Sequence, residues 1–306
     1  MATKSFLENF AQELRDQDRS DNTVLGYLTD VKDFQRWFVQ TKGENFSLPA
    51  LTPTDIREYR QHLWTVRKLS PNTVNRRLAS LSALTTWGMT QEQIKVDPMS
   101  NIKYIKQVRV AKCRWLDKKG RFALQRVIEK ELQESSRLPH RRSLWRQRDA
   151  VLVTLMLKTG LRVAEVAALD VSDVELNPRS GRVKVRGKGN KARVVPLNAE
   201  AREKLQMWLA AHPTTETSAL FVSQMLTRVT TRTVERVVTE YGYMARLEHL
   251  TPHALRHTFA KALVDRGVPI DQVAKLLGHS NLNTTRIYTE PNERDLEKAV
   301  NMLVES

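Results

Sequence analysis

Apolar residues recur every three or four positions through the first hundred residues of this chain, a spacing that is typical of amphipathic helices. Ser20 or Asp21 can cap the first long stretch. The apolar positions of that stretch are Val24, Tyr27, Leu28, Val31, Phe34 and Phe38. Thr52 and Ser70 are each followed by a proline, which is typical of a helix start because the hydroxyl can accept a free backbone N–H. We therefore predict an all-helical N-terminal region.

The helix that starts at Ser70 has two chemically different faces. Its apolar stripe consists of Val74, Leu78, Leu81 and Leu84. Arg76, Arg77 and Ser80 fall away from that stripe when the helix is drawn at 3.6 residues per turn. A short basic face of this kind suits a DNA groove, and a solvated charged surface is the alternative. We predict that these three residues contact DNA.

The pattern changes in the second half of the chain. Periodicity resumes near Trp115 and predicts helices over about 117–134 and 146–158, with an irregular segment at 135–145 around Pro139. Residues 182–186 then alternate basic and apolar side chains, which predicts a strand.

A β-hairpin and further helices complete the pattern. Gly187-Lys188-Gly189-Asn190 has the glycine and asparagine residues that are typical of a turn. Residues 192–195, before Pro196, are predicted to form the second strand of the hairpin. Helices are expected from about Ala199 to the C-terminus. The fold class is therefore mainly α, with a small antiparallel β-sheet in the second half.

Three segments follow from these patterns. A helical domain spans 1–102, a basic interdomain linker spans 103–114, and a mostly α second domain spans 115–306. The linker has little periodicity and carries Lys103, Lys106, Arg109, Lys112 and Arg114. A cationic linker can follow DNA phosphates, so Lys103, Lys106 and Arg109 are predicted DNA contacts.

Composition narrows the class of protein. The 306 residues carry 50 Lys and Arg against 34 Asp and Glu, a formal net charge of +16. The charge is −2 over residues 1–60, +6 over 61–110 and +12 over 111–306. Such an excess most often indicates a polyanionic partner, usually nucleic acid.

Several other classes are excluded. Apolar residues make up 41% of the chain, too many for a mostly disordered protein. No apolar run approaches a membrane span, and residues 1–10 lack a signal core, so we expect a cytoplasmic protein. The lone Cys113 excludes an internal disulfide network and a multi-cysteine zinc site.

Three short motifs in the second half carry candidate chemistry. They are Thr159-Gly160-Leu161-Arg162-Val163-Ala164-Glu165, Thr251-Pro252-His253-Ala254-Leu255-Arg256-His257-Thr258-Phe259-Ala260, and Leu277-Gly278-His279-Ser280 with Tyr288 beyond it. Gly160 is expected to end one helix, so that Arg162 and backbone N–H groups at the next helix start meet an anion. Thr251 is expected to cap a helix, and Gly278 to end one.

Each motif alone has an ordinary explanation. Arg162 can be a surface ion-pair partner, His279 a structural histidine, and Tyr288 a half-buried aromatic residue. His253 and His257 have the spacing of zinc ligands, but Ala254 replaces the glutamate of that motif.

Six residues taken together fit chemistry on a phosphodiester: Arg162, Lys188, His253, Arg256, His279 and Tyr288. Arg162 and Arg256 supply guanidinium groups that bind non-bridging oxygens and stabilise growing negative charge. A lysine such as Lys188 can protonate the leaving oxygen, and a tyrosine hydroxyl can attack phosphorus. The sequence shows neither a carboxylate cluster for magnesium nor a G-x-x-x-x-G-K-[ST] loop for ATP. We therefore predict no metal and no cofactor.

The order of these motifs resembles a known family. T-G-L-R-x-x-E, G-K-G-N-K, H-x-L-R-H-T-F-A, L-G-H-S and Y follow one another over residues 159–289. The chain resembles the tyrosine recombinases of the phage integrase family, and the Xer recombinases most of all. The resemblance implies a core-binding domain of the SAM-like helical type, followed by a catalytic domain with a C-terminal tail helix.

The resemblance also implies a role for each site residue. Arg162, Arg256, His253 and His279 would surround the scissile phosphate, and Lys188 would be the general acid. Tyr288 would form a 3′-phosphotyrosyl bond. Glu165 would orient a neighbouring side chain of the site, and His257 would support the residues that touch the phosphate. Lys191 would be the alternative general acid or would contact the DNA backbone.

The family implies an assembly as well. Four protomers would hold two double-stranded DNA sites with inverted repeats and exchange strands through a Holliday junction, either to resolve dimers and cointegrates or to move genetic elements. The tail, with Leu296, Ala299, Val300 and Leu303 at helical spacing, would dock on the neighbouring protomer or pack on its own domain. A partner recombinase or an accessory protein remains open. A type IB topoisomerase and a non-catalytic DNA-binding regulator are the alternative functions.

Overall fold

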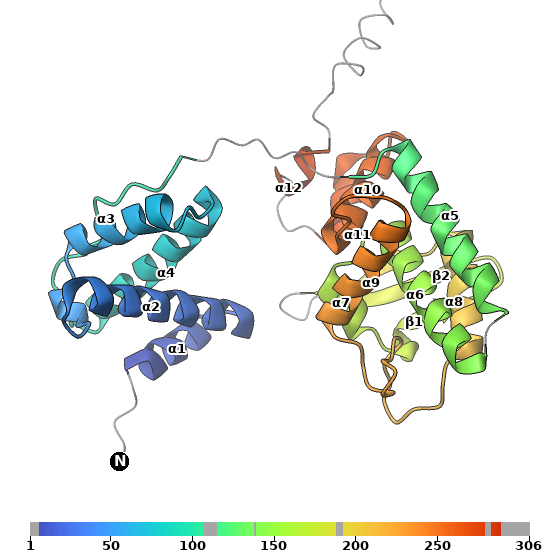
Figure 1. Ribbon diagram of the computed structural model, residues 1–306, viewed down its shortest axis with the longest axis horizontal. Coiled ribbons are helices and arrows are strands. Elements are labelled where there is room, and N and C mark those ends of the chain that lie inside the picture. The colour runs from blue at the N-terminus through green and yellow to red at the C-terminus, as the bar shows by residue number, and fades with distance from the viewer. Residues whose placement is uncertain (1–5, 107–114, 138, 188–191, 279–282, 289–306) are drawn as a thin grey trace, which may run out of the picture. The chain divides into compact units, whose positions relative to one another are not determined.

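The chain divides into two compact units, Met1–Val110 and Ala111–Ser306. The computed structural model describes residues 6–106, 115–137, 139–187, 192–278 and 283–288 (Figure 1). No helix in these described ranges is both long and apolar enough to cross a membrane.

The first unit is helical where it is described. Its elements are α1 (Phe6–Asp16), α2 (Asp21–Lys42), the 3₁₀ turn η1 (Leu48–Ala50), α3 (Pro53–Gln61), the π-helical turn η2 (His62–Val66) and α4 (Pro71–Thr90). The side chains of Ser20, Thr52 and Ser70 each accept the backbone N–H three residues on. These caps confirm the predicted helix starts.

Aromatic side chains dominate the core of this unit. Helix α2 packs on α4, and Phe34 lies with Tyr59 in an edge-on ring pair whose centroids are 4.9 Å apart. Other fully buried members are Phe10, Ile56, Leu63, Leu78, Leu81 and Leu84. The stripe predicted for the Ser70 helix therefore faces the core, as expected.

The second unit is mixed and mostly helical. Its elements are α5 (Lys118–Ser135), α6 (His140–Thr159), α7 (Val163–Ala168), the 3₁₀ turn η3 (Val171–Asp173), β1 (Val174–Leu176), β2 (Gly181–Arg186), β3 (Ala192–Pro196), α8 (Ala199–Ala211), α9 (Thr231–Met244), α10 (Pro252–Val264), α11 (Ile270–Leu277) and α12 (Asn283–Arg286). Its strands form one antiparallel sheet in the order β1-β2-β3, with Val183 paired to Val195.

Helix α6 is the centre of this unit. Residues 150–156 are buried on every side, and the helix contacts α5, α8, α9 and α10. A helical stretch that is buried on every side has no solvent face, which explains why four helices surround this part of α6.

The structure corrects three details of the prediction. Helix α6 begins at His140, directly after Pro139, so most of the segment predicted as irregular is helical. A third strand, β1, extends the predicted hairpin. The chain between α8 and α9 is not helical; Trp208 anchors it by donating its indole N–H to the carbonyl of Leu220 at 2.7 Å.

Candidate functional site

A left-handed turn at Gly160 presents the first arginine of the site. Gly160 ends α6 with φ +64°, and a Cβ at this position would lie 2.5 Å from Cδ1 of Phe259. Only glycine fits this turn without strain, because the turn requires a positive φ and leaves no space for a Cβ beside the Phe259 ring. Arg162 then stands immediately before α7, as predicted.

Glu165 fixes the start of α7. Its carboxylate accepts the backbone N–H of Arg162 at 2.7 Å and Nη1 of Arg162 at 2.9 Å. Glu165 therefore contacts Arg162 directly, and its orienting role stays a prediction. The expectation that backbone N–H groups here stand ready for an anion is wrong for the amide of Arg162, because Glu165 occupies it.

Sequence reasoning missed a third arginine, Arg193 on β3. Its Nη1 and Nη2 atoms donate to the two carboxylate oxygens of Glu165 at 2.7 and 2.9 Å. The signal was present in the strand, because Arg193 shares its inward face with the buried Val195. A charged residue on the inward face of a strand calls for a buried partner.

Arg256 lies deepest in the site. The residue is 2% exposed on α10, and its Nη1 and Nη2 atoms donate to the carbonyls of Gly160 and Leu277, both at 2.7 Å. Burial lowers the pKa of Arg256 to about 10, with a further contribution from the charge of Arg162. The side chain remains a cation at neutral pH.

The three arginines meet at the C-terminus of α11. Arg193 Nε donates to the carbonyl of Leu276 at 3.0 Å, and Arg162 Nη2 donates to that of Gly278 at 3.1 Å. Arg162 also reaches the carbonyl of Leu277, which Arg256 already binds. The last carbonyls of a helix carry partial negative charge, so they stabilise this cluster of cations.

Two histidines connect the arginines to the tyrosine. Thr251 caps α10 as predicted, and His253 and His257 lie one turn apart with ring centroids 4.2 Å from each other. Burial lowers the pKa of His253, and the charges of Arg256 and Arg162 add to that effect. Burial, His253 and Arg256 together lower the pKa of His257 to about 4, so His257 is neutral at pH 7.

Tyr288 lies inside the unit with its hydroxyl on His257. The residue is 1% exposed and packs against Ala260, Val273 and Leu277. Its hydroxyl oxygen is 2.6 Å from Nδ1 of His257. The structure therefore places His257 nearer to the tyrosine than the sequence prediction did.

Not every predicted site residue can be placed. Lys188, Lys191, His279 and Arg109 lie outside the described residues. Helix α11 ends at Gly278 in a left-handed turn, as predicted, so the backbone that leads into His279 is fixed by the arginine contacts. Within the described ranges, no three His, Cys, Asp or Glu side chains gather so that they could hold a metal ion.

The predicted basic face of α4 is largely inward. Ser80 is fully buried and donates its hydroxyl to Asp30 at 2.8 Å. Arg77 pairs with Asp33, and its side chain is only 13% exposed. The prediction that these two residues lie on an outward face is wrong, because α2 supplies their partners inside the unit: Asp33 pairs with Arg77, and Asp30 accepts the hydroxyl of Ser80.

Other predicted DNA contacts do reach the surface. The Arg76 side chain pairs with Asp30 and is still 51% exposed. Lys103 and Lys106 are exposed at the end of the first unit's described part.

Glu165 gives the site a measurable pH signature. Burial raises its pKa, but hydrogen bonds from Arg193 and Arg162 outweigh burial and hold the pKa at about 2. A folded-state pKa below the unfolded value stabilises the fold above about pH 4.5, and this stability is lost as pH falls toward 2. The shift corresponds to roughly 3 kcal/mol.

We therefore expect Glu165→Gln to lower the unfolding free energy at pH 7 and to flatten its dependence on pH. Urea unfolding of both proteins at pH 7 and pH 3 measures the difference. Glu175→Gln is the matched control, because Glu175 pairs with Arg182 on the exposed side of the sheet. Parallel curves for the wild type and Glu165→Gln would contradict the role of the Glu165 carboxylate.

Known proteins share this sequence and fold. The model of the phage integrase family matches residues 126–295, and that of a phage integrase N-terminal SAM-like domain matches residues 6–95. The tyrosine recombinase XerC of Corynebacterium glutamicum is 33% identical over 288 residues, which cover 92% of this chain and 86% of that protein. A tyrosine recombinase of Pseudothermotoga lettingae is 32% identical over 302 residues, 98% of each chain.

A solved structure shows the same fold. The XerH site-specific recombinase, crystallised with a palindromic difH substrate in a post-cleavage complex, has a TM-score of 0.74 and 24% identity. The match covers 100% of this chain and 86% of that one.

Proposed function

Because this chain belongs to the phage integrase family of tyrosine recombinases, we propose that Tyr288 is the nucleophile of its DNA breaking-rejoining reaction. The enzyme is a site-specific DNA recombinase. The observation that carries the Tyr288 assignment is the 2.6 Å contact between its hydroxyl and His257. His257 directly follows Arg256 in the chain and lies one helical turn from His253. The tyrosine and the phosphate-binding cations thereby belong to one site.

The arginines suit the negative charge of a phosphate in the transition state. Arg162 and Arg256 both reach the Leu277 carbonyl, so their guanidinium groups lie close enough to bind one phosphate. Each guanidinium has five N–H donors, so donors remain for non-bridging oxygens. His253 donates a further hydrogen bond in this scheme, and His279 completes the group.

Proton transfer needs one acceptor and one donor. Neutral His257 can accept the phenolic proton at Nδ1 as the Tyr288 oxygen attacks phosphorus. The leaving 5′-oxygen then takes a proton from Lys188, with Lys191 as the alternative. The product is a 3′-phosphotyrosyl bond and a free 5′-hydroxyl.

The covalent bond sets the energetics of strand exchange. A phosphotyrosine keeps the energy of the original phosphodiester, so a second 5′-hydroxyl can reseal the strand without ATP. In our proposal four protomers hold two inverted-repeat DNA sites in the cytoplasm and exchange strands in two steps through a Holliday junction. The relatives are named recombinases, which favours this function over topoisomerase-like relaxation or a non-catalytic regulator.

A nicked suicide substrate tests the proposal directly. Loss of the short 5′-hydroxyl fragment prevents religation, so the protein should remain attached to a DNA 3′ end. Peptide mapping of the trapped adduct should place the phosphate on Tyr288. Phosphate on another tyrosine would contradict the assignment, and the absence of any adduct would contradict the covalent mechanism.

In this proposal the remaining basic residues hold the DNA duplex through contacts with its phosphates. Arg76, Lys103 and Lys106 are exposed cations of the first unit, and we include Arg109 from the sequence. Each phosphate contact releases counterions, so affinity for DNA should fall steeply with salt.

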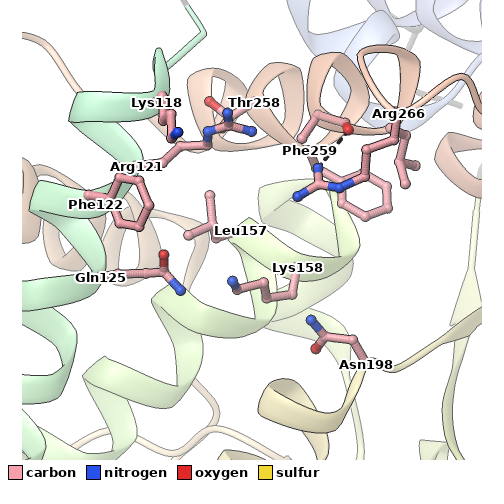
Figure 2. A pocket seen from close by; sticks show the side chains of 12 residues that line it. Lys118, Arg121, Phe122, Gln125, Leu157, Lys158, Asn198, Thr258, Phe259 and Arg266 are labelled. Atoms are coloured by element: carbon pink, nitrogen blue, oxygen red, sulfur yellow. Dashed lines mark hydrogen bonds between the residues drawn. The ribbon is translucent and has the colours of Figure 1, made fainter.

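A basic pocket suggests how neighbouring protomers connect. The pocket holds about 570 Å³ between α5, α6 and α10 (Figure 2). Its cations are Lys118, Arg121, Lys158 and Arg266, and its apolar lining includes Phe122, Leu157, Phe259 and Leu263. Residues 289–306 have a formal charge of −3 and an apolar stripe, so their chemistry complements this pocket. We assign the pocket as the place where a neighbour's tail docks.

A double-mutant cycle checks the tail assignment. Arg121→Glu and Leu296→Asp should each weaken assembly on paired DNA sites about tenfold, and the double variant should lose no more than either alone. Sedimentation of the DNA-bound complex measures assembly, and binding to a single site verifies that DNA contact is intact. Arg137→Glu, exposed just beyond α5, is the control. Fully additive losses would contradict contact between the tail and the pocket.

A further inference from the structure

Residues 102–106, hereafter the strap, lie along the surface of the first unit. The strap has no regular secondary structure, and its buried Ile102 and half-buried Ile105 pack in the hydrophobic core of that unit. Lys103, Tyr104 and Lys106 are exposed. The apolar side chains therefore hold the strap against the unit and leave its two lysines outward.

One side chain of α4 binds both backbone groups of a strap residue. Asn75 Oδ1 accepts the N–H of Ile105 at 2.9 Å, and Asn75 Nδ2 donates to the carbonyl of Ile105, also at 2.9 Å. A carboxamide has a donor and an acceptor in one plane, so it can pair with both groups of one residue. Asparagine is a weak helix former, so the contribution of Asn75 is this tertiary contact rather than the stability of α4.

A second anchor lies two residues earlier in the strap. Arg60 of α3 donates from Nη1 to the carbonyl of Lys103 at 2.6 Å. Arg60 and Asn75 therefore fix the strap on two different helices of the unit. Lys103 is itself a bonded residue, and Lys106 directly follows the bonded Ile105, so both lysines start from a fixed backbone.

The strap adds cations to the part of the surface where Arg76 lies. Arg76 directly follows Asn75 and Lys106 directly follows Ile105, so the bonded pair brings these two cations to one region. Arg76 pairs with Asp30. Within the described part of the chain, no carboxylate forms an ion pair with Lys103 or Lys106. Exposed lysines in this state are available for DNA phosphates.

We propose that Asn75 is a positioning residue for DNA binding, which fixes the strap so that Lys103 and Lys106 meet the phosphates at one spacing. The inference rests on the proposed function, in which these two lysines contact DNA. Asn75 acts through the backbone of Ile105 and not through a contact of its own with the duplex. A loose strap would spread the lysines over many positions, and the apparent affinity would fall with the fraction of molecules whose lysines match the phosphates.

Hydrogen exchange of the full chain without DNA tests whether Asn75 holds the strap. The Ile105 N–H should exchange at least about tenfold more slowly than in an unfolded peptide, because it donates to Asn75. Asn75→Ala removes the acceptor and should bring the exchange of this amide close to the unfolded rate. Alanine favours the helix, so the amide of Leu78 in the buried part of α4 should keep its protection.

A double-mutant cycle then tests whether this positioning serves DNA binding. The probe is a fluorescent DNA duplex of about 30 base pairs and mixed sequence, because phosphate contacts do not depend on sequence. Lys103→Ala with Lys106→Ala should weaken binding and reduce the slope of log affinity against log salt by about 2. Asn75→Ala should weaken binding about tenfold in the wild type and less than about twofold without the two lysines, because no cation then remains to be positioned.

A second variant breaks the same contact from the strap. Ile105→Pro has no N–H to donate to Asn75 and leaves every residue of α4 unchanged, so it should weaken DNA binding about as much as Asn75→Ala. Asn9→Ala is the matched control, because Asn9 is an exposed asparagine on α1 of the same unit. This control should bind the duplex like the wild type.

Three results would overturn the proposal. They are an unprotected Ile105 amide in the wild type, wild-type affinity in Asn75→Ala or Ile105→Pro, and an undiminished loss for Asn75→Ala in the protein without the two lysines. The lysine variant alone separates the two levels of the argument: wild-type affinity there would refute the proposed DNA contact of the strap, and this inference with it. None of these results bears on the Tyr288 assignment, which adduct mapping tests.

Discussion

Tyr288→Phe is expected to yield no covalent protein–DNA product from a nicked suicide substrate. The change removes only the attacking oxygen, and the ring can still pack against Trp115 and Leu277. Cleavage should fall on the order of 10⁴-fold or more, as for loss of a nucleophile in other enzymes. Non-covalent binding to the same DNA should persist. Denaturing gel electrophoresis of the adduct and a mobility-shift assay measure the two properties.

The matched control for this experiment is Tyr241→Phe, which removes the hydroxyl of another buried tyrosine in the same unit. It should retain full cleavage. Loss of the Tyr288 hydroxyl also leaves Nδ1 of His257 without that contact, so a fall in stability of about 1 kcal/mol is expected. An adduct that forms at the wild-type rate with Tyr288→Phe would refute the assignment.

Arg256→Lys should have the next largest effect, although it keeps the charge. A lysine cannot hold the carbonyls of Gly160 and Leu277 and also bind a phosphate, because its donors radiate from a single nitrogen. We expect single-turnover cleavage to fall about 10²-fold to 10³-fold, the usual cost of losing one fixed donor to a transition-state oxyanion. Thermal unfolding should also occur at a lower temperature, because buried carbonyls lose a partner.

Arg236→Lys is the control for this substitution. Arg236 is exposed on α9 and pairs only with Glu240 among the described side chains, so neither cleavage nor stability should change much. If Arg256→Lys cleaved at the wild-type rate, a simple positive charge would suffice, and the fork geometry assigned to Arg256 would be wrong.

Local signals explain which parts of the fold were predictable from sequence. The caps at Thr52, Ser70 and Thr251 depend on residues within three positions, and so do the turns at Gly160 and Gly278. Strand β1 escaped prediction because three residues are too short to show an alternation. The sequence does not reveal the early start of α6, because a proline can either interrupt a helix or precede its first turn, and Pro139 does the latter.

Buried charges were harder to predict because their partners are remote in sequence. Periodicity placed Arg77 and Ser80 outside, and carboxylates more than forty residues away on α2 bring them inside. Arg193 was missed for the same reason, since Glu165 lies 28 residues before it. The family motifs identified Arg162 and Arg256, but only the structure shows that one helix end holds all three arginines.

The contacts of the arginine cluster determine that the arginine side chains lose their conformational entropy when the unit folds, before DNA binds. Fixing an arginine side chain in one conformation costs up to ~2 kcal/mol of rotamer freedom. Here Gly160, Leu277, Gly278 and Glu165 immobilise the guanidinium groups while the unit folds. This loss of side-chain entropy therefore lowers the stability of the folded protein, and it does not reduce the free energy of DNA binding. A phosphate that enters the site meets donors that have already given up their freedom of motion.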